Sequence, residues 1–306
     1  SRGLGDVYKR QVFPNSFTAI ACNQSYPFKG TFDGQGHRIT GLYQIYPKYN
    51  EKAYGLFGYL GNEAVVKDLI LDKAYIAKTT NSYAGLLATE AQGTISHVGV
   101  EGKITSSMNY QYASANGGLA GHTTATSNVL ECYALVDMEV HNDACGGLIG
   151  ERSGTIADSY ARGSVAYKSN GAFGGVSVNG GSGMTNCYAA MTVSFGKTPV
   201  YNTNTKGNVG GAYGTTPYGS TDNPGFYNRD LVQPAFDALS EEYQAQAYNR
   251  GTALTTEQMS TMAAFTGFDF TNVWGRRNDL NEGYPYLRWT ATPGLDNDSD
   301  TPVGLD

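Results

Sequence analysis

Two stretches of this chain repeat one pattern 28 residues apart. GGLIGERSGTIADSYARGSV covers residues 146–165 and GGVSVNGGSGMTNCYAAMTV covers residues 174–193, with glycine pairs, a Tyr-Ala step and a final valine at matching places. The glycine step recurs at Gly55, Gly85, Gly118, Gly147, Gly175 and Gly211. Units of 27 to 36 residues with about three short strands are too small to bury their own apolar face, so neighbouring units must stack.

Two further points of each unit agree between copies. The second strand starts at Val66, Ile95, Val129, Ile156 and Met184, and a third apolar point follows at Ile76, Ile104, Met138, Val165 and Val193. This pattern predicts an all-β fold, a right-handed parallel β-helix of about seven coils whose equivalent residues stack about 4.8 Å apart. We expect one internal stack to contain Leu69, Val98, Cys132, Ser159 and Cys187.

The chain divides into four parts by pattern. Residues 1–11 resemble translated adaptor read-through and are interpreted as a non-native or disordered tail, and residues 12–228 carry the repeats. Residues 229–290 are predicted to cap the solenoid, and residues 291–306 to be an acidic linker within a longer multidomain surface protein. In the cap we expect a helix over 233–249, a second helix from the capping box Thr255–Gln258 to Ala264, and closing strands at FDF and YPYLRW.

The repeats also resemble a known family. FKGTFDGQGHRITGL at residues 28–42, the GLFG step and the NCY and DSY units are similar to the GLUG-motif repeats, over about residues 28–228. Such repeats occur in bacterial secreted and surface proteins, including stalk regions of zinc proteases that cleave immunoglobulin A. The resemblance implies a right-handed parallel β-helix and an extracellular or cell-surface location, and it does not imply a ligand.

Composition excludes several classes of function. Charged residues make up 16% of the chain, the net charge is -6 and no Lys/Arg cluster occurs, so a nucleic-acid partner is not expected. No apolar run approaches the roughly 20 residues that span a bilayer. The cysteines Cys22, Cys132, Cys145 and Cys187 form no CxxC pair, and we expect no zinc and no other cofactor. Cys132 and Cys187 fall in one slot two coils apart, about 10 Å, which is too far for a disulfide.

One polar ladder is a candidate site. The residue before the inward residue of each second strand is polar in five coils: Asp68, His97, Glu131, Asp158 and Asn186. Stacking would place Asp68 beside His97 and Glu131 beside Asp158. Two adjacent carboxylates would repel, raise one pKa and offer a site for a cation. The alternative, which we favour, is a structural corner in which short polar side chains satisfy turn amides.

Tyrosines supply candidate binding residues. Tyr133, Tyr160 and Tyr188 are in register on three coils and should face outward, either as a stack that holds coils together or as a platform for sugars. The longer loops at 43–54, 106–117 and 197–207 are rich in Tyr, Asn, Ser and Thr, and insertions in solenoids gather on one side. From these loops we select Tyr110, Tyr112 and Tyr201. Such loops suit a glycan or an extracellular protein, or they merely cover the surface.

Signals for catalysis are poor. The four histidines contain no H-E-x-x-H pair, no G-x-S-x-G elbow occurs, and the outward charges are scattered. We therefore predict a non-catalytic adhesion, binding or spacer module. The alternative is a carbohydrate-active β-helix enzyme, a polysaccharide lyase or glycoside hydrolase. Convergence of acidic side chains around Asp68 and His97, or around Glu131 and Asp158, with a basic residue nearby would favour the enzyme.

Overall fold

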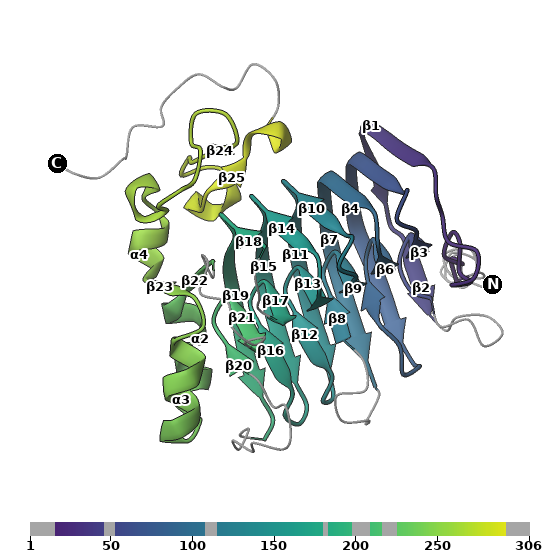
Figure 1. The fold of residues 1–306 in the computed structure, drawn as a ribbon. Helices are drawn as coiled ribbons and strands as arrows, with labels where there is room; N and C mark the ends of the chain where they lie inside the picture. Colours follow the sequence, from purple (N-terminus) through teal and green to yellow (C-terminus); the bar gives the residue numbers. More distant parts are fainter. Residues whose placement is uncertain are drawn as a thin grey trace, which may run out of the picture.

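The chain forms a parallel β-solenoid. The computed structural model describes residues 16–45, 53–107, 115–179, 183–197, 209–215 and 225–291. These residues build about six turns, where the repeats predicted about seven, followed by a small C-terminal region of helices and short strands (Figure 1). The all-β parallel architecture predicted from the repeat is confirmed.

Three parallel sheets make up the sides of the solenoid within the described residues. The long sheet has twelve strands: β1 (Thr31–Thr40), β2 (Tyr43–Ile45), β4 (Val65–Lys78), β7 (Thr94–Ser106), β10 (Asn128–Leu130), β11 (Tyr133–Val140), β14 (Thr155–Ala157), β15 (Tyr160–Tyr167), β18 (Met184–Thr185), β19 (Tyr188–Phe195), β22 (Phe226–Asn228) and β23 (Thr252–Leu254). The five-stranded sheet contains β5 (Ala84–Gly85), β8 (Ala115–Gly117), β12 (Ala144–Gly146), β16 (Ala172–Gly174) and β20 (Val209–Gly210). The six-stranded sheet contains β3 (Phe57–Leu60), β6 (Ala88–Ala91), β9 (Ala120–Thr123), β13 (Ile149–Arg152), β17 (Ser177–Asn179) and β21 (Tyr213–Thr215).

Pairing between coils follows the repeat in the sequence. The third apolar point is in register on five successive strands, through Ile76, Ile104, Met138, Val165 and Val193. The predicted internal stack is confirmed as well, because every member is at most 1% exposed: Leu69, Val98, Cys132, Ser159 and Cys187. Cys132 and Cys187 are buried thiols outside any disulfide, so they fill the core as expected.

The repeated glycines allow close packing of coils. A Cβ atom on Gly146 or Gly174 would overlap the carbonyl oxygen three residues further along, at Ile149 or Ser177. Neither glycine has a positive φ, so the reason for glycine here is space and not backbone conformation. Close approach therefore explains glycine at these two positions, whereas Gly55 of the glycine step has a φ of 109°.

The first coil is described from residue 16 onward. Ile20 and Phe28 form parallel bridges to Phe57 and Leu60, and β1 and β2 both pair with β4. The register of β1 against β4 shifts between Asp33 and His37. Gln35 has a φ of 52° there, and its N–H donates to Asp33 Oδ1 at 2.9 Å. The Gly-Gln-Gly turn is thus a bulge in the first coil.

Helices close the other end of the solenoid. Two helices, α2 (Arg229–Phe236) and α3 (Glu241–Tyr248), bury Phe236 and Tyr243 against the core. The prediction of one helix over 233–249 is wrong, because Ser240 is extended (φ −63°, ψ 152°) and its carbonyl accepts the first N–H bonds of α3. The capping box at Thr255 is confirmed, and it starts α4 (Thr256–Met259), followed by a 3₁₀ turn, η1 (Met262–Ala264).

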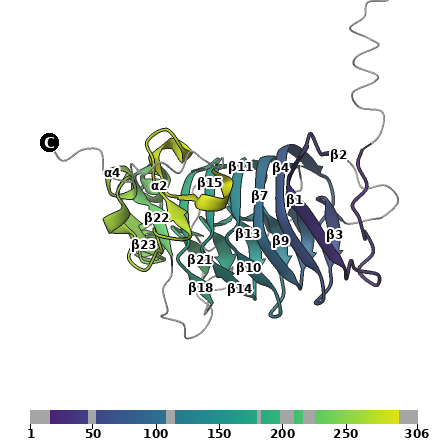
Figure 2. The ribbon, with the colours of Figure 1, turned by 90° about the horizontal axis from the view of Figure 1, so that it is seen from above.

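The last described segment folds back over the outside of the long sheet. This C-terminal strap, residues 265–291, contains β24 (Trp274–Gly275), β25 (Tyr286–Leu287) and two 3₁₀ turns, η2 (Asn281–Gly283) and η3 (Arg288–Thr290). Figure 2 shows it in yellow beside β15. The FDF segment, predicted as a strand, is not one in the structure. The ring of Phe268 packs 4.6 Å from that of Trp274. Among the described helices, none has the length and apolar character needed to cross a bilayer.

Candidate functional site

The predicted polar ladder lies at one corner of the solenoid. Every member has a left-handed backbone conformation, with φ between 46° and 53°: Asp68, His97, Glu131, Asp158 and Asn186. Asn, Asp and His tolerate this conformation far better than other residues with a side chain. Backbone geometry therefore accounts for the residue types at four of the five positions, and Glu131 is the exception.

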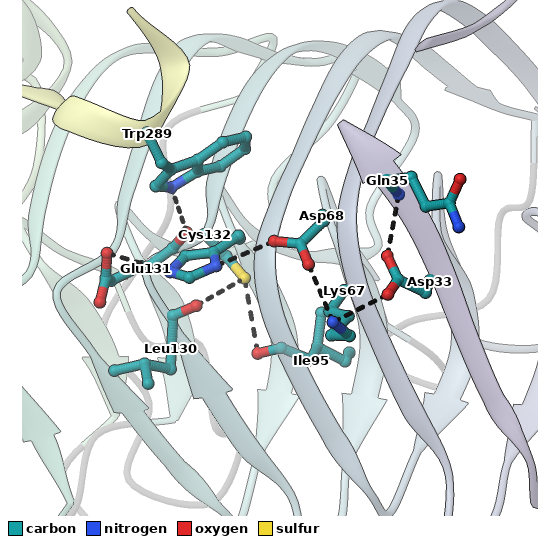
Figure 3. Close-up of polar contacts among 10 residues, drawn as sticks. Asp33, Gln35, Lys67, Asp68, Ile95, Leu130, Glu131, Cys132 and Trp289 are labelled. Atoms are coloured by element: carbon teal, nitrogen blue, oxygen red, sulfur yellow. Dashed lines mark hydrogen bonds and ion pairs between the residues drawn. The ribbon is translucent and has the colours of Figure 1, made fainter. Parts of the chain in front are cut away.

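The exposed half of this ladder is a row in which acidic and basic side chains alternate. His97 lies between two carboxylates, with Nδ1 3.0 Å from Asp68 Oδ1 and Nε2 3.3 Å from Glu131 Oε2. Lys67 lies between Asp68 and a third carboxylate, with Nζ 3.2 Å from Asp68 and 2.9 Å from Asp33 (Figure 3). The hydrogen bond to Asp33 is the main cause that raises the pKa of Lys67. Acidic side chains thus converge around Asp68 and His97 beside a basic residue, and each carboxylate is paired with a cationic or hydrogen-bonding neighbour.

The other half of the ladder is covered by the C-terminal strap. Asp158 Oδ1 accepts from Asn186 at 3.0 Å and from the indole of Trp274 at 3.1 Å. The indole of Trp289 donates to the backbone carbonyl of Glu131 at 2.9 Å, as Figure 3 shows. The adjacency of Asp68 and His97 is confirmed, whereas Glu131 contacts His97 and Asp158 contacts the strap.

The tyrosine ladder faces outward, as predicted, but it is not a free surface. The rings of Tyr133, Tyr160 and Tyr188 stack at 5.4 and 5.0 Å with interplanar angles of 13° and 2°. They are only 4%, 3% and 0% exposed because Trp274 and Trp289 lie over them. The option of an exposed sugar platform is therefore wrong for these rings, and ring contact between coils is what the ladder provides.

Polar contacts fasten the strap to the ladder. The hydroxyl of Tyr188 donates to the carbonyl of Pro285 and accepts from Asn281 Nδ2 at 2.8 Å. Arg162 on β15 donates to Asn281 Oδ1 at 2.6 Å, and its guanidinium lies 4.8 Å from the ring centre of Tyr284. Burial raises the pKa of the Tyr188 phenol well above its ordinary value. The strap therefore belongs to the folded core of this face.

A cleft lies between the strap and the long sheet. It has a volume of about 260 Å³ and is lined by Arg38, Ile70, Glu101, Tyr133, Leu135, Tyr160, Leu280, Asn281, Tyr286, Thr290 and Ala291. Its polar groups are held in place, since Glu101 accepts from Tyr133 at 2.8 Å and lies 3.4 Å from Arg38. Burial, followed by the negative charge of Glu101, raises the pKa of the Tyr133 phenol. The cleft combines apolar side chains with a guanidinium, a carboxylate and an amide.

A second histidine row lies on the six-stranded sheet, and the sequence reasoning missed it. Tyr59, Glu90, His122 and Glu151 are in register on successive coils. His122 Nδ1 is 3.2 Å from Glu90, and this hydrogen bond is the main cause that lowers the pKa of Glu90. The ring of Tyr83 stacks on His122 at 4.9 Å and its hydroxyl donates to Glu151 at 2.8 Å. The sequence does contain a signal for this row, because each of its members follows the glycine step of its coil by four or five residues.

The three loop tyrosines that were predicted to bind a ligand, Tyr110, Tyr112 and Tyr201, are not among the residues that the structure describes. One of these loops connects β7 to β8, and the other connects β19 to β20. Both therefore run from the long sheet to the five-stranded sheet, at the same corner of the solenoid. Within the described ranges, no group of three or more His, Cys, Asp or Glu side chains is arranged to hold a metal ion.

Comparisons with known proteins bear on the fold. No family model matches the chain. Halomucin of Haloquadratum walsbyi is 30% identical over 119 residues, which is 39% of this chain, and the chain spans about 1% of the length of halomucin. The crystal structure of a "putative immunoglobulin A1 protease" from Bacteroides ovatus matches with a TM-score of 0.50 and 15% identity, over 90% of this chain and 82% of that one. The chain is thus a β-solenoid similar in fold to that structure.

Proposed function

We propose that this chain is a non-catalytic module of a secreted or cell-surface protein, which binds a glycan and spaces neighbouring parts of that protein. We also propose that its coils are repeats of the GLUG type. The likeness in fold to a protein named as an immunoglobulin A1 protease supports this, because the sequence resembles stalk regions of such proteases. Protease activity is not part of the proposal, since the four histidines contain no H-E-x-x-H pair.

The cleft beside the strap carries the binding proposal. Its lining includes the partly buried apolar side chains of Ile70 and Leu135 together with the polar side chains of Arg38, Glu101 and Asn281. Apolar contact with a few fixed polar groups is the usual composition of a small-molecule site. Planar guanidinium, carboxylate and amide groups form hydrogen bonds with sugar hydroxyls. Because Glu101 is tied to both Arg38 and Tyr133, it serves better as an oriented acceptor than as a proton donor.

A glycan array probed with the purified chain tests this proposal. We expect binding to a limited set of glycans, and loss of at least tenfold in affinity for Arg38→Ala and for Glu101→Gln. Lys103→Ala is the matched control, because Lys103 lies on the same long sheet in an exposed pair with Glu139 and does not line the cleft. Binding that survives both cleft substitutions would place the ligand elsewhere, and absence of binding would contradict the proposal.

A second candidate function has one observation in its favour. The convergence of Asp68, His97 and Glu131 beside Lys67 is the arrangement expected of a carbohydrate-active β-helix enzyme. The cleft is lined by none of these four residues, which favours the structural interpretation. Incubation with a panel of acidic and neutral polysaccharides distinguishes the two. Cleavage that is abolished by Asp68→Asn or Glu131→Gln would establish the enzyme.

A further inference from the structure

Three polar side chains lie together inside the solenoid. Lys78 ends β4, Asn116 is the centre of β8, and Asp143 precedes β12. They are 1%, 0% and 1% exposed, respectively. Burying a charged group costs far more than burying an apolar one unless the structure compensates it, so this buried triad needs a physical reason.

The positions themselves are otherwise mostly apolar. The slot of Lys78 is filled on later coils by Ser106, and then by Val140 and Tyr167. The slot of Asn116 is filled by Ala84 on the preceding coil and, on the following coils, by Cys145 and Phe173. The lysine and the asparagine are thus departures from the repeat, and they occur on adjacent coils.

The geometry brings an amine, an amide and a carboxylate into mutual contact. Lys78 Nζ lies 3.0 Å from the carbonyl oxygen Oδ1 of Asn116 and 3.3 Å from Asp143 Oδ2. The amide nitrogen Nδ2 of Asn116 donates to the same carboxylate oxygen at 3.1 Å. One oxygen of Asp143 therefore touches both the amine and the nitrogen of the amide.

The surroundings favour a reactive amine. Removal of water is the main cause that lowers the pKa of Lys78, against the opposing effect of Asp143. A neutral amine is a nucleophile, whereas an ammonium ion is not. Nζ contacts Oδ1, the oxygen bonded to Cγ of Asn116, so the amine is held next to the carbon that it would attack. Groups held together in a fixed orientation react with high effective molarity.

We propose that Lys78 and Asn116 join in an intramolecular isopeptide bond, with Asp143 as the group that carries the proton. A proton first passes from the Lys78 ammonium to the carboxylate of Asp143. The neutral amine Nζ then attacks Cγ of Asn116, and a new C–N bond forms. Asp143 gives its proton to Nδ2 and takes one from Nζ, the bond from Cγ to Nδ2 breaks, and ammonia leaves. No oxidant, reductant or cofactor is required.

The bond would lock two neighbouring coils together. It joins residues 38 positions apart, at the end of β4 and in β8, on either side of residues 79–115. It would therefore tether both ends of the coil that contains β7. A spacer exposed to pulling force or proteases would gain resistance to local opening of this coil.

Mass spectrometry of the full purified chain tests the proposal. We expect an intact mass lower than the sequence mass by one ammonia. After digestion with trypsin we expect no cleavage at Lys78 and a branched product in which residues 74–103 are linked to residues 104–152. A wild-type chain that has the sequence mass and is cleaved after Lys78 would overturn the proposal.

Two variants exclude the other source of this mass change. Asn116 precedes Gly117, and an Asn-Gly step can also lose ammonia by closing a succinimide ring on its own backbone. Lys78→Arg should restore the sequence mass if the isopeptide bond forms, and it should leave the loss in place if a succinimide forms. Asp143→Ala should also have the sequence mass, with folding checked by circular dichroism. A branched product formed equally fast in Asp143→Ala would overturn the role of Asp143.

Discussion

Two lysines of this protein lie beside aspartates in opposite settings. Lys67 contacts Asp33 at 2.9 Å, and both side chains are 37% exposed. Lys78 contacts Asp143 at 3.3 Å, and the two are 0% and 1% exposed. Hydrogen bonds to aspartates raise the pKa of Lys67, whereas burial lowers the pKa of Lys78. The shorter contact should therefore contribute less to stability, because exposure to solvent and not distance decides how much loss of one partner costs.

The corner ladder lies between these two extremes. Its first half, from Asp68 to Glu131, is partly open to water, and its second half is covered where Trp274 donates to Asp158. The effect of removing a polar group should thus decrease from the buried triad, through the covered half, to the exposed half. Substitutions at Asp143, Trp274 and Asp68 test this order, and a pH series tests the buried thiols.

The largest effect is expected at the buried triad. Asp143→Ala should lower the free energy of unfolding by about 4 kcal/mol, the chain-entropy value of a cross-link that closes a loop of this length. Removal of one partner of a buried pair costs a similar amount, about 3–5 kcal/mol, so a large loss is expected with or without the link. Denaturant unfolding measures the change. A loss under about 1 kcal/mol would mean that the buried triad stabilises the protein no more than the exposed ion pairs do.

The covered half of the ladder depends on Trp274. Trp274→Ala should destabilise the protein by about 3 kcal/mol. It removes a fully buried ring that packs against the tyrosine ladder, and it removes the indole N–H that donates to Asp158. It should also expose Tyr160 and Tyr188 to water. The fluorescence of the remaining Trp289 and unfolding in urea report both effects. An unchanged unfolding curve would show that the strap does not stabilise the solenoid.

Alkaline pH should act on the buried thiols. Burial raises the pKa of the Cys132 and Cys187 thiols from 9.0 to about 12. A raised folded-state pKa means that the stabilisation is complete below pH 9 and is lost as the pH rises from 9 toward 12, by up to about 1.4 kcal/mol per unit for each thiol. Unfolding measured between pH 8 and pH 11 shows the slope.

A matched variant isolates the thiol contribution. Ser159 fills the same internal slot on the intervening coil, so Cys132→Ser and Cys187→Ser copy a residue that the slot already accepts. Each substitution should make the decline above pH 9 shallower. An equal slope in the double variant would assign the alkaline loss to other groups, such as the buried tyrosines.

The smallest effect is expected at the exposed half. Asp68→Asn keeps the size of the side chain and its tolerance of a left-handed backbone, and it removes the charge that faces Lys67 and His97. We expect a change below about 1 kcal/mol that salt reduces further. Asp68→Ala is the comparison, because it adds the backbone cost of about 1–2 kcal/mol. A large, salt-sensitive loss in Asp68→Asn would mean that the charged row matters more than exposure suggests.

Much of the solenoid could be predicted from the sequence, for a simple physical reason. Residues equivalent by repeat pair directly on adjacent coils, so the period of the sequence is also the register of the sheets, as the stack from Leu69 to Cys187 shows. The same reasoning placed Asp68 beside His97. It did not identify the partner of the Glu131 carboxylate, which contacts His97. It was wrong in the cap, where Ser240 divides one expected helix into two.

The repeat by itself thus determined the parallel fold, the internal stacks and the outward direction of the tyrosines. Tertiary structure decided what covers them, since the strap returns over Tyr133 from more than a hundred residues further along the chain. It also decided the meeting of Lys78, Asn116 and Asp143, because loops of unequal length separate these residues and no period relates them. Periodic contacts can be read from a sequence because each coil repeats its neighbour, whereas contacts made once depend on how the whole chain closes.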